Sequence, residues 1–326
     1  MSGEFISILA VLTFVGSNVI FRQTEHEVSP IFINFFRTLI GTLTFIIIIL
    51  LVNQFSIIFI IPWEIWLLLI LSFIFGQVIG DTAYFTAQRE LGATIALAIS
   101  MTFPLFTFIL SLIILNQPFT LNLVISLILI GSGITIIGKS KLNSNNSKKL
   151  DLSSSNVAIT KRVSEIPRKD IFKAIGFCIT ASLGWAFGAV IIYFATIQID
   201  QIVDVEELSS VIGNVIRFPF ATLILGSMVL RENYMKKDYS SSRNDRKSLR
   251  TWLLLIVSSI LGTSLGAYLY TEAIHVAGAN IMALIASASP LFALPLSYIV
   301  NKEKISKYGF IGVILTVLGV VVILIM

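Results

Sequence analysis

The chain has 326 residues and a formal net charge of +5; 56% of its residues are hydrophobic and only 13% are charged. Soluble domains carry about 25% charged residues, so this composition excludes a soluble protein and predicts an all-α integral membrane protein. The single cysteine, Cys178, and the two histidines, His26 and His275, exclude a disulfide framework, a multi-cysteine zinc site and haem attachment.

Ten apolar stretches can each cross a bilayer as a helix, which takes roughly 17–25 residues. The first follows the N-terminus without a basic region or a cleavage site, so we expect a retained span and not a signal peptide. A polar, basic linker covers residues 139–171, and a shorter polar insert covers residues 231–250. The ten predicted spans are residues 4–21, 30–52, 63–87, 91–115, 119–138, 172–198, 206–230, 251–273, 277–300 and 305–325.

Part of the sequence is an internal repeat. Residues 76–117 recur without a gap as residues 262–303, with 14 identities among 42 paired positions. In the first span, Gly16 is matched with Gly184 of the sixth. The identities in the repeated segment include Gly76/Gly262, Gly80/Gly266, Tyr84/Tyr270, Gly92/Gly278 and Pro104/Pro290.

The second half therefore repeats the first in outline. An Asn-x-x-Arg motif that ends at Arg37 in the second span recurs in the seventh, where it ends at Arg217. Because five is an odd number, two five-span copies joined by one linker must lie in opposite orientations. The sequence predicts ten transmembrane helices arranged as two inverted five-helix repeats, residues 1–138 and 172–326.

The basic residues predict the orientation of these spans. Of the 23 lysines and arginines, 21 lie in loops that follow odd-numbered spans, and the other two, Arg37 and Arg217, lie inside spans. Since basic loops stay in the cytoplasm, we expect both polar linkers to be cytoplasmic and both termini to lie on the outer side of the membrane. We expect a multi-pass protein of the plasma membrane.

Several features point together to one known family. They are the two five-span copies, the arginine in the second span of each, Gly-Ala at the start of the fourth, a central Pro-Leu-Phe, and Asn301-Lys302-Glu303 before the last span. This pattern resembles the EamA-type transporters of the drug/metabolite transporter superfamily. The resemblance implies inverted repeats around a central cavity and alternating-access movement of small solutes. One departure is Gln117, which stands in the first copy where the second has Glu303.

Small residues, prolines and arginines inside spans are the expected structural and gating residues. Glycines four residues apart let helix backbones approach closely, although helix packing alone also explains them. A proline frees a backbone carbonyl, so a kinked helix belongs in the interior or beside a cavity. Arg37 lies about seven residues into its span, which favours snorkelling to the interface over pairing with a carboxylate. The residues concerned are Arg37, Arg217, Gly80, Gly266, Pro104 and Pro290.

Polar residues at membrane depth are the candidates for binding a solute, because burying an ionisable group there costs roughly 3 kcal/mol or more. Asp81 shares a helix face with Gln77 and Tyr84, and could pair with an arginine, bind an amino group or carry a coupling proton. Glu272 could equally belong to a solvated helix end. The expected substrate-binding residues are Asn18, Gln77, Asp81, Tyr84, Ser100, Trp185, Tyr268, Tyr270, Glu272 and Ser287.

These observations predict a secondary transporter that moves a small organic solute, such as an amino acid or another metabolite, with export as one direction. We expect no catalytic residue, metal or cofactor. Two alternatives stay open: a lipid-modifying membrane enzyme, which would need acidic or histidine motifs on its loops, and a non-transporting receptor or scaffold. The expected partners are the solute and membrane lipids but no nucleic acid, while a coupling proton or other ion and a homodimer are left open.

Overall fold

The structure of the protein is a computed structural model. It describes residues 2–24, 27–91, 93–115, 124–133, 168–203, 208–237, 248–289 and 307–324, with shorter pieces at 121–122, 135–136, 292–293, 295–296 and 299. Among the residues that we singled out in the sequence, His26, Gly92, Gln117, Pro290 and Glu303 lie outside this part of the chain, as does most of the basic linker.

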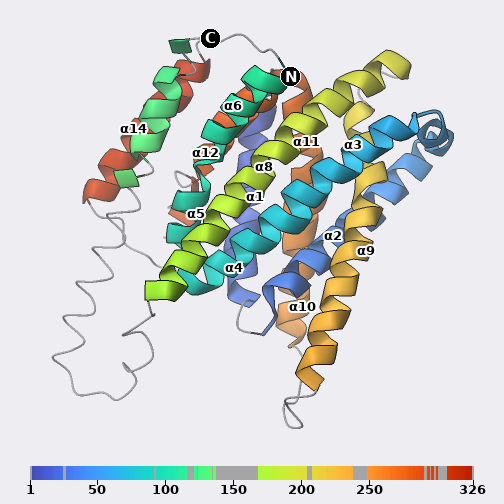
Figure 1. The fold of residues 1–326 in the computed structure, drawn as a ribbon, viewed down its shortest axis with the longest axis horizontal. Coiled ribbons are helices and arrows are strands. Elements are labelled where there is room, and N and C mark those ends of the chain that lie inside the picture. The colour runs from blue at the N-terminus through green and yellow to red at the C-terminus, as the bar shows by residue number, and fades with distance from the viewer. Residues whose placement is uncertain are drawn as a thin grey trace.

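The described residues form helices joined by short turns (Figure 1). The α-helices are α1 (Gly3–Phe21), α2 (Pro30–Leu51), α3 (Trp63–Phe73), α4 (Thr82–Leu91), α5 (Ala93–Ser100), α6 (Phe103–Ile114), α8 (Arg168–Ile202), α9 (Ser209–Lys237), α10 (Leu249–Ser259), α11 (Gly266–Ala277), α12 (Ala279–Ser287) and α14 (Lys307–Leu324). The short 3-10 helices are η1 (Arg22–Thr24) and η2 (Phe55–Phe59), and the π-helical segments are η3 (Ile74–Asp81) and η5 (Ile260–Leu265).

Six continuous helical stretches in the described part of the chain are long and apolar enough to cross a membrane. They are Gly3–Thr24, Pro30–Leu51, Trp63–Arg89, Phe172–Ile202, Ser209–Tyr234 and Leu249–Ala277. Phe103–Ile114 and Val124–Gly133 are shorter apolar helices. The protein is thus all-helical with six long spans, and the count of ten spans stays a prediction.

Local chemistry explains where several helices begin. Ser29 caps α2 by accepting a hydrogen bond from the Phe32 amide at 3.2 Å, and Pro30 takes the first helical position, where its missing N–H is not needed. Ser248 caps α10 by accepting from the Thr251 amide, also at 3.2 Å. α8 begins at Arg168, four residues before the predicted span, and α9 continues to Lys237 into the predicted polar insert.

Two π-helical segments lie at matching positions in the two halves. η3 begins at Ile74 and η5 at Ile260, and these residues are 186 positions apart, the offset of the sequence repeat. Each segment joins two α-helices into one span, α3 to α4 and α10 to α11. A π-helical turn widens the helix and frequently marks a functional site.

The predicted kink at Pro104 is a break between two helices. α5 ends at Ser100, and Pro104 lies in the first turn of α6, where it costs no hydrogen bond. The Ser100 carbonyl, which we expected to lose its usual partner, accepts a hydrogen bond from the Ser182 hydroxyl of α8 at 2.7 Å. At the junction of α11 and α12, Gly278 has φ 86°, a conformation that glycine adopts without strain.

α8 runs diagonally across the bundle, with α3 and α4 along one side and α5 and α6 along the other (Figure 1). Its glycines allow close contact with η3, because a Cβ added at Gly184 would lie 2.5 Å from the Phe75 carbonyl oxygen and 3.1 Å from the Gly80 Cα. A Cβ on Gly188 would lie 3.2 Å from the Gly76 Cα. α8, which belongs to the second half of the chain, is therefore packed closely against the first half.

α1, which belongs to the first half of the chain, packs in the corresponding way against the second half. Its Ser17 contacts Gly262 and its Thr13 contacts Gly266, the glycines that repeat Gly76 and Gly80. By these contacts Thr13 corresponds to Gly184, so matching Gly16 with Gly184 from the sequence was wrong by three positions.

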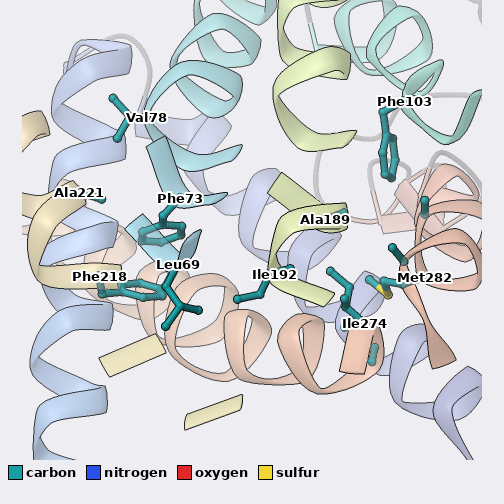
Figure 2. Packing of buried hydrophobic residues seen from close by; sticks show 14 of the residues in the cluster. Leu69, Phe73, Val78, Phe103, Ala189, Ile192, Phe218, Ala221, Ile274 and Met282 are labelled. Carbon is teal, nitrogen blue, oxygen red and sulfur yellow. The ribbon is translucent and has the colours of Figure 1, made fainter. Parts of the chain in front are cut away.

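An aromatic cluster holds α2, α3 and α9 together beside the crossing helices. Phe218 of α9 lies 4.5 Å from Phe73 and 5.0 Å from Phe45 between ring centroids. Figure 2 shows Phe73 and Phe218 facing one another with Leu69 beside them. Gly41 of α2 makes room for this ring, since a Cβ there would lie 2.4 Å from Phe218.

Candidate functional site

A cavity of about 140 Å³ lies where the crossing helices meet, far more than the roughly 10–15 Å³ that one water molecule requires. Helices from both halves of the chain contribute to it: α1, α2, α3, η3, α6, α8, α9, η5, α11 and α12. Three charged side chains face it, Arg37, Asp81 and Arg217, and the rest of its wall is mostly apolar. A cavity of this kind suits a small organic molecule that has a polar end.

The structure brings together seven of the predicted site residues. Those that line the cavity are Gln77, Asp81, Trp185 and Tyr270 from the substrate-binding set, and Arg37, Arg217 and Gly266 from the structural and gating set. Those that do not line it are Asn18, Tyr84, Ser100, Tyr268, Glu272, Ser287, Gly80 and Pro104. Ala267 and Ser289 also line the cavity, as do residues that sequence reasoning did not propose: Phe14, Phe73, Met101, Phe103, Thr263, Met282 and Ala286.

Arg37 and Asp81 form a buried ion pair in the cavity wall, with Nη2 and Oδ2 2.7 Å apart. The other carboxylate oxygen, Oδ1, accepts a hydrogen bond from Trp185 Nε1 at 2.8 Å. The Gln77 amide completes the cluster: with its nitrogen toward Asp81 it donates at 2.8 Å and accepts from Arg37 Nε at 3.2 Å. The expectation that Arg37 snorkels was wrong, because its side chain is 8% exposed and is paired inside the protein.

Arg217 has a different environment, although it repeats Arg37. Its Nε and Nη2 donate to Asn214 Oδ1 at 3.0 and 2.7 Å, and Nη2 also donates to Thr271 Oγ1 at 2.7 Å. The guanidinium carbon lies 4.7 Å from the centre of the Phe73 ring, a cation–π contact. Within the described residues Arg217 forms no ion pair, so its charge is held by neutral groups alone.

Aromatic rings build the wall around Trp185. Its ring lies edge-on to Phe14 and Phe103, at 6.5 and 5.9 Å between centroids. Tyr84 packs against the same ring at 5.3 Å and supports it without reaching the cavity. These contacts and the hydrogen bond to Asp81 fix the orientation of the indole.

Two of the predicted site residues outside the cavity donate hydrogen bonds to backbone carbonyl groups. Ser100 donates to the Cys178 carbonyl at 3.4 Å, and Ser287 donates to the Leu284 carbonyl within its own helix at 2.6 Å. Glu272 is half-buried on α11 and does not face the cavity.

Polar clusters lie near two loops at the ends of the bundle. Glu27 accepts hydrogen bonds from the Thr251 hydroxyl at 2.6 Å and the Ser248 amide at 3.1 Å, and these bonds hold the pKa of Glu27 below its usual value. In the other cluster, Asp200 at the end of α8 is bonded to Ser209 and His275. Among the described residues no group of three or more histidine, cysteine or acidic side chains could hold a metal ion.

Comparison with known proteins places this architecture in a family. The sequence matches the EamA-like transporter family over residues 1–139 and again over residues 172–325. The chain belongs to the EamA-like transporter family. It is a multi-pass integral membrane protein and a membrane transporter, and the family is not one of enzymes, which removes the lipid-modifying alternative.

Two relatives agree with membership of the EamA-like family. An uncharacterized transporter of Archaeoglobus fulgidus is 25% identical over 321 residues, which cover 98% of this chain and 96% of that protein. A solved crystal structure superposes with a TM-score of 0.70 at 14% identity and covers 98% of this chain and 95% of its own. The structural likeness supports the fold, and the family membership supports transport of a small molecule.

Proposed function

We propose that the protein is a secondary transporter that carries a small organic solute through the central cavity by alternating access. Its two halves, residues 1–138 and 172–326, would act as inverted repeats of five helices each, joined by the basic linker. The observation that carries the proposal is the cavity itself. Both halves line it, and repeat-related arginines, Arg37 and Arg217, face it from opposite copies.

The crossing helices supply a means of movement. η3 and η5 occupy matching positions, and each packs closely against a helix of the other half: η3 against Gly184 and Gly188 of α8, and η5 against the small side chain of Ser17 of α1. Surfaces with only small residues between them can slide or rock with little steric cost. We propose that one half rocks against the other at these two contacts and exposes the cavity to each side of the membrane in turn.

The plasma membrane and an orientation with both basic linkers in the cytoplasm are part of the proposal. Their support is the distribution of the basic residues, 21 of 23 of which follow odd-numbered predicted spans. Figure 1 shows the start of α8 and the end of α9, which adjoin the two linkers, at the same end of the bundle. A reporter fused after Met326 that fluoresces only in the cytoplasm should stay dark.

The test of alternating access needs no knowledge of the solute. Ala286 lines the cavity, whereas Ala283 lies on the same helix, is buried and does not line it. In a Cys178→Ala background, Ala286→Cys should react with a membrane-impermeant thiol reagent applied from either face of oriented vesicles. Ala283→Cys should react from neither face. Reaction of Ala286→Cys from one face only, under all conditions, would refute alternating access and favour a receptor or scaffold.

Proton coupling through Asp81 is a further part of the proposal, supported by its place in the cavity wall. Glu272, the other residue considered, lies outside the cavity and has less support. Once a solute is known, its uptake into proteoliposomes should respond to an imposed pH gradient in the wild type and not in Asp81→Asn. A wild type that ignores the gradient would exclude this coupling.

A further inference from the structure

We infer that the transported solute is a small organic anion whose carboxylate group binds Arg217. This inference rests on the proposed transport function and names the chemical class of its substrate. It starts from the charges of the cavity. Among the described lining residues Arg37 and Asp81 neutralise one another, which leaves the positive charge of Arg217 uncompensated.

The hydrogen bonds of Arg217 leave one nitrogen of the guanidinium group, Nη1, available as a donor. Its Nε and Nη2 donate to Asn214 and Thr271, while Nη1 has no acceptor among the residues that the structure describes. The free Nη1 can donate a charge-assisted hydrogen bond to a carboxylate, and such bonds are about twice as strong as neutral ones and are strengthened by burial. A buried cation without a counter-ion is costly in a membrane protein and is kept mostly where it has a function.

Comparison of the two halves shows what is missing beside Arg217. Arg37 and Arg217 are 180 positions apart, and Asp81 and Ala267 are 186 positions apart, so Ala267 takes the place of the acid in the second half. Ala267 lines the cavity. The first half thus supplies its own carboxylate, and the second half offers a methyl group and an open cavity where that carboxylate would be.

A second observation points to a polar ligand group at the same place. Thr263 lines the cavity and is 1% exposed, yet its hydroxyl oxygen has no hydrogen-bond partner among the described residues. A buried hydroxyl without a partner is rare and needs an explanation. Thr263 corresponds to Gln77, which in the first half binds the Arg37 and Asp81 pair. A solute carboxylate would give Thr263 the acceptor that it lacks.

The same geometry disfavours cations and zwitterions. Both oxygens of Asp81 already accept hydrogen bonds, from Arg37 and from Trp185, so an ammonium group would have to displace one of them. The remaining wall is mostly apolar and includes Phe73, Met282 and the Trp185 indole. The favoured solute therefore has one carboxylate and an apolar body.

Four matched probes test this class: 3-phenylpropionate, its neutral amide, phenylalanine and phenethylamine. Binding to the purified full chain in nanodiscs is measured by calorimetry at constant pH. The carboxylate should bind in the millimolar range or tighter, and the other three should bind at least about tenfold more weakly. Absence of carboxylate binding, or an equal affinity for the amide, the amino acid or the amine, would overturn the inference.

Variants at the proposed site give a second readout. Arg217→Gln should weaken binding of the carboxylate by at least about tenfold. Ala267→Asp should do the same by placing an internal carboxylate beside Arg217, and it should raise the melting temperature. Ala267→Asn, which is matched in size but neutral, should retain binding within about threefold. Unchanged affinity in Ala267→Asp, or equal loss in Ala267→Asn, would overturn the assignment.

The experiments can reject the anionic substrate and the transport function separately. Two-sided reaction of Ala286→Cys together with no preference for the carboxylate would keep the transporter and reject its anionic substrate. One-sided reaction together with binding of the carboxylate that depends on Arg217 would keep the anion site and reject alternating access.

Discussion

The hydroxyl groups of Thr42 and Thr222 lie 2.6 Å apart. These threonines are 180 positions apart, the offset that also relates Arg37 to Arg217, so each is in contact with its own counterpart in the other half. A residue can touch its counterpart only near the axis that relates two copies. The contact between α2 and α9 therefore marks the place where the two halves meet symmetrically.

Thr42→Val should destabilise the protein by about 1 kcal/mol, which is the net value of one hydrogen bond. The cost is small because the Thr222 hydroxyl keeps a second partner, the Phe218 carbonyl at 3.0 Å. Thermal unfolding in detergent should show that Thr42→Val/Thr222→Val loses less than the sum of the two single changes. Strict additivity would show that the two hydroxyls do not interact.

Gly184→Ala should destabilise the crossing of α8 and η3 strongly, by about 2 kcal/mol or more, because the new methyl group meets backbone atoms that cannot move aside. The matched control is Gly176→Ala on the same helix, where an added Cβ has no neighbour within 4 Å. This control should be neutral or slightly stabilising. Equal melting temperatures for the two variants would contradict the close contact.

Asp81→Asn should destabilise the protein by about 3–5 kcal/mol, because removing one partner of a buried ion pair leaves the other charge uncompensated. The charge left behind is that of Arg37, which would keep only Gln77 and the cation–π contact with Phe85 at 5.4 Å. The double variant Arg37→Gln/Asp81→Asn should recover part of the loss in thermal unfolding. A double variant less stable than Asp81→Asn would show that Arg37 is stabilised by other groups.

Glu27→Gln should loosen the start of α10, since it weakens the bonds to Ser248 and Thr251. Hydrogen exchange of residues 248–252 should be faster in this variant at neutral pH. Because the pKa of Glu27 is lowered in the folded protein, the contact contributes stability above the pKa of the unfolded chain and loses it as the pH falls through the folded pKa.

The difference between wild type and Glu27→Gln should therefore disappear only below the usual titration range of a glutamate. Glu232→Gln is the control, because Glu232 accepts a hydrogen bond from Ser29 at the start of α2. A difference that persists unchanged into strong acid would show that the charge of Glu27 has no part in the contact.

The sequence was sufficient for the class of protein and for most helix positions, because long apolar runs have few alternatives in a bilayer. The second predicted span, residues 30–52, is observed as Pro30–Leu51. Arg37, Asp81 and Arg217, which we singled out in the sequence, line the cavity, and pairing with an arginine was among the roles considered for Asp81. Which of these roles holds depends on the distance between α2 and η3, and no single-helix pattern reports that distance.

Two kinds of information were beyond the reach of sequence patterns. Apolar lining residues such as Met282 and Phe14 give no polar signal that would separate them from the core. The π-helical segments depend on the hydrogen bonds of the assembled helix, for which residue preferences are weak. Glu272 was chosen for its charge, yet it does not line the cavity; it lies on α11 two residues after Tyr270, which does, and residues two apart on an α-helix point to nearly opposite sides.

The packing of α8 against the first half, and of α1 against the second, has a consequence for synthesis in the membrane. When the first half has entered the bilayer, Arg37 and Asp81 can already pair, but Trp185, which supplies a hydrogen bond to Asp81, has not yet been made. The glycine face of η3 likewise lacks its partner until α8 emerges. The first half should therefore wait in a loosely packed, chaperone-sensitive form, and a ribosome that stalls in the basic linker would leave that surface open to lipid and to quality-control proteases.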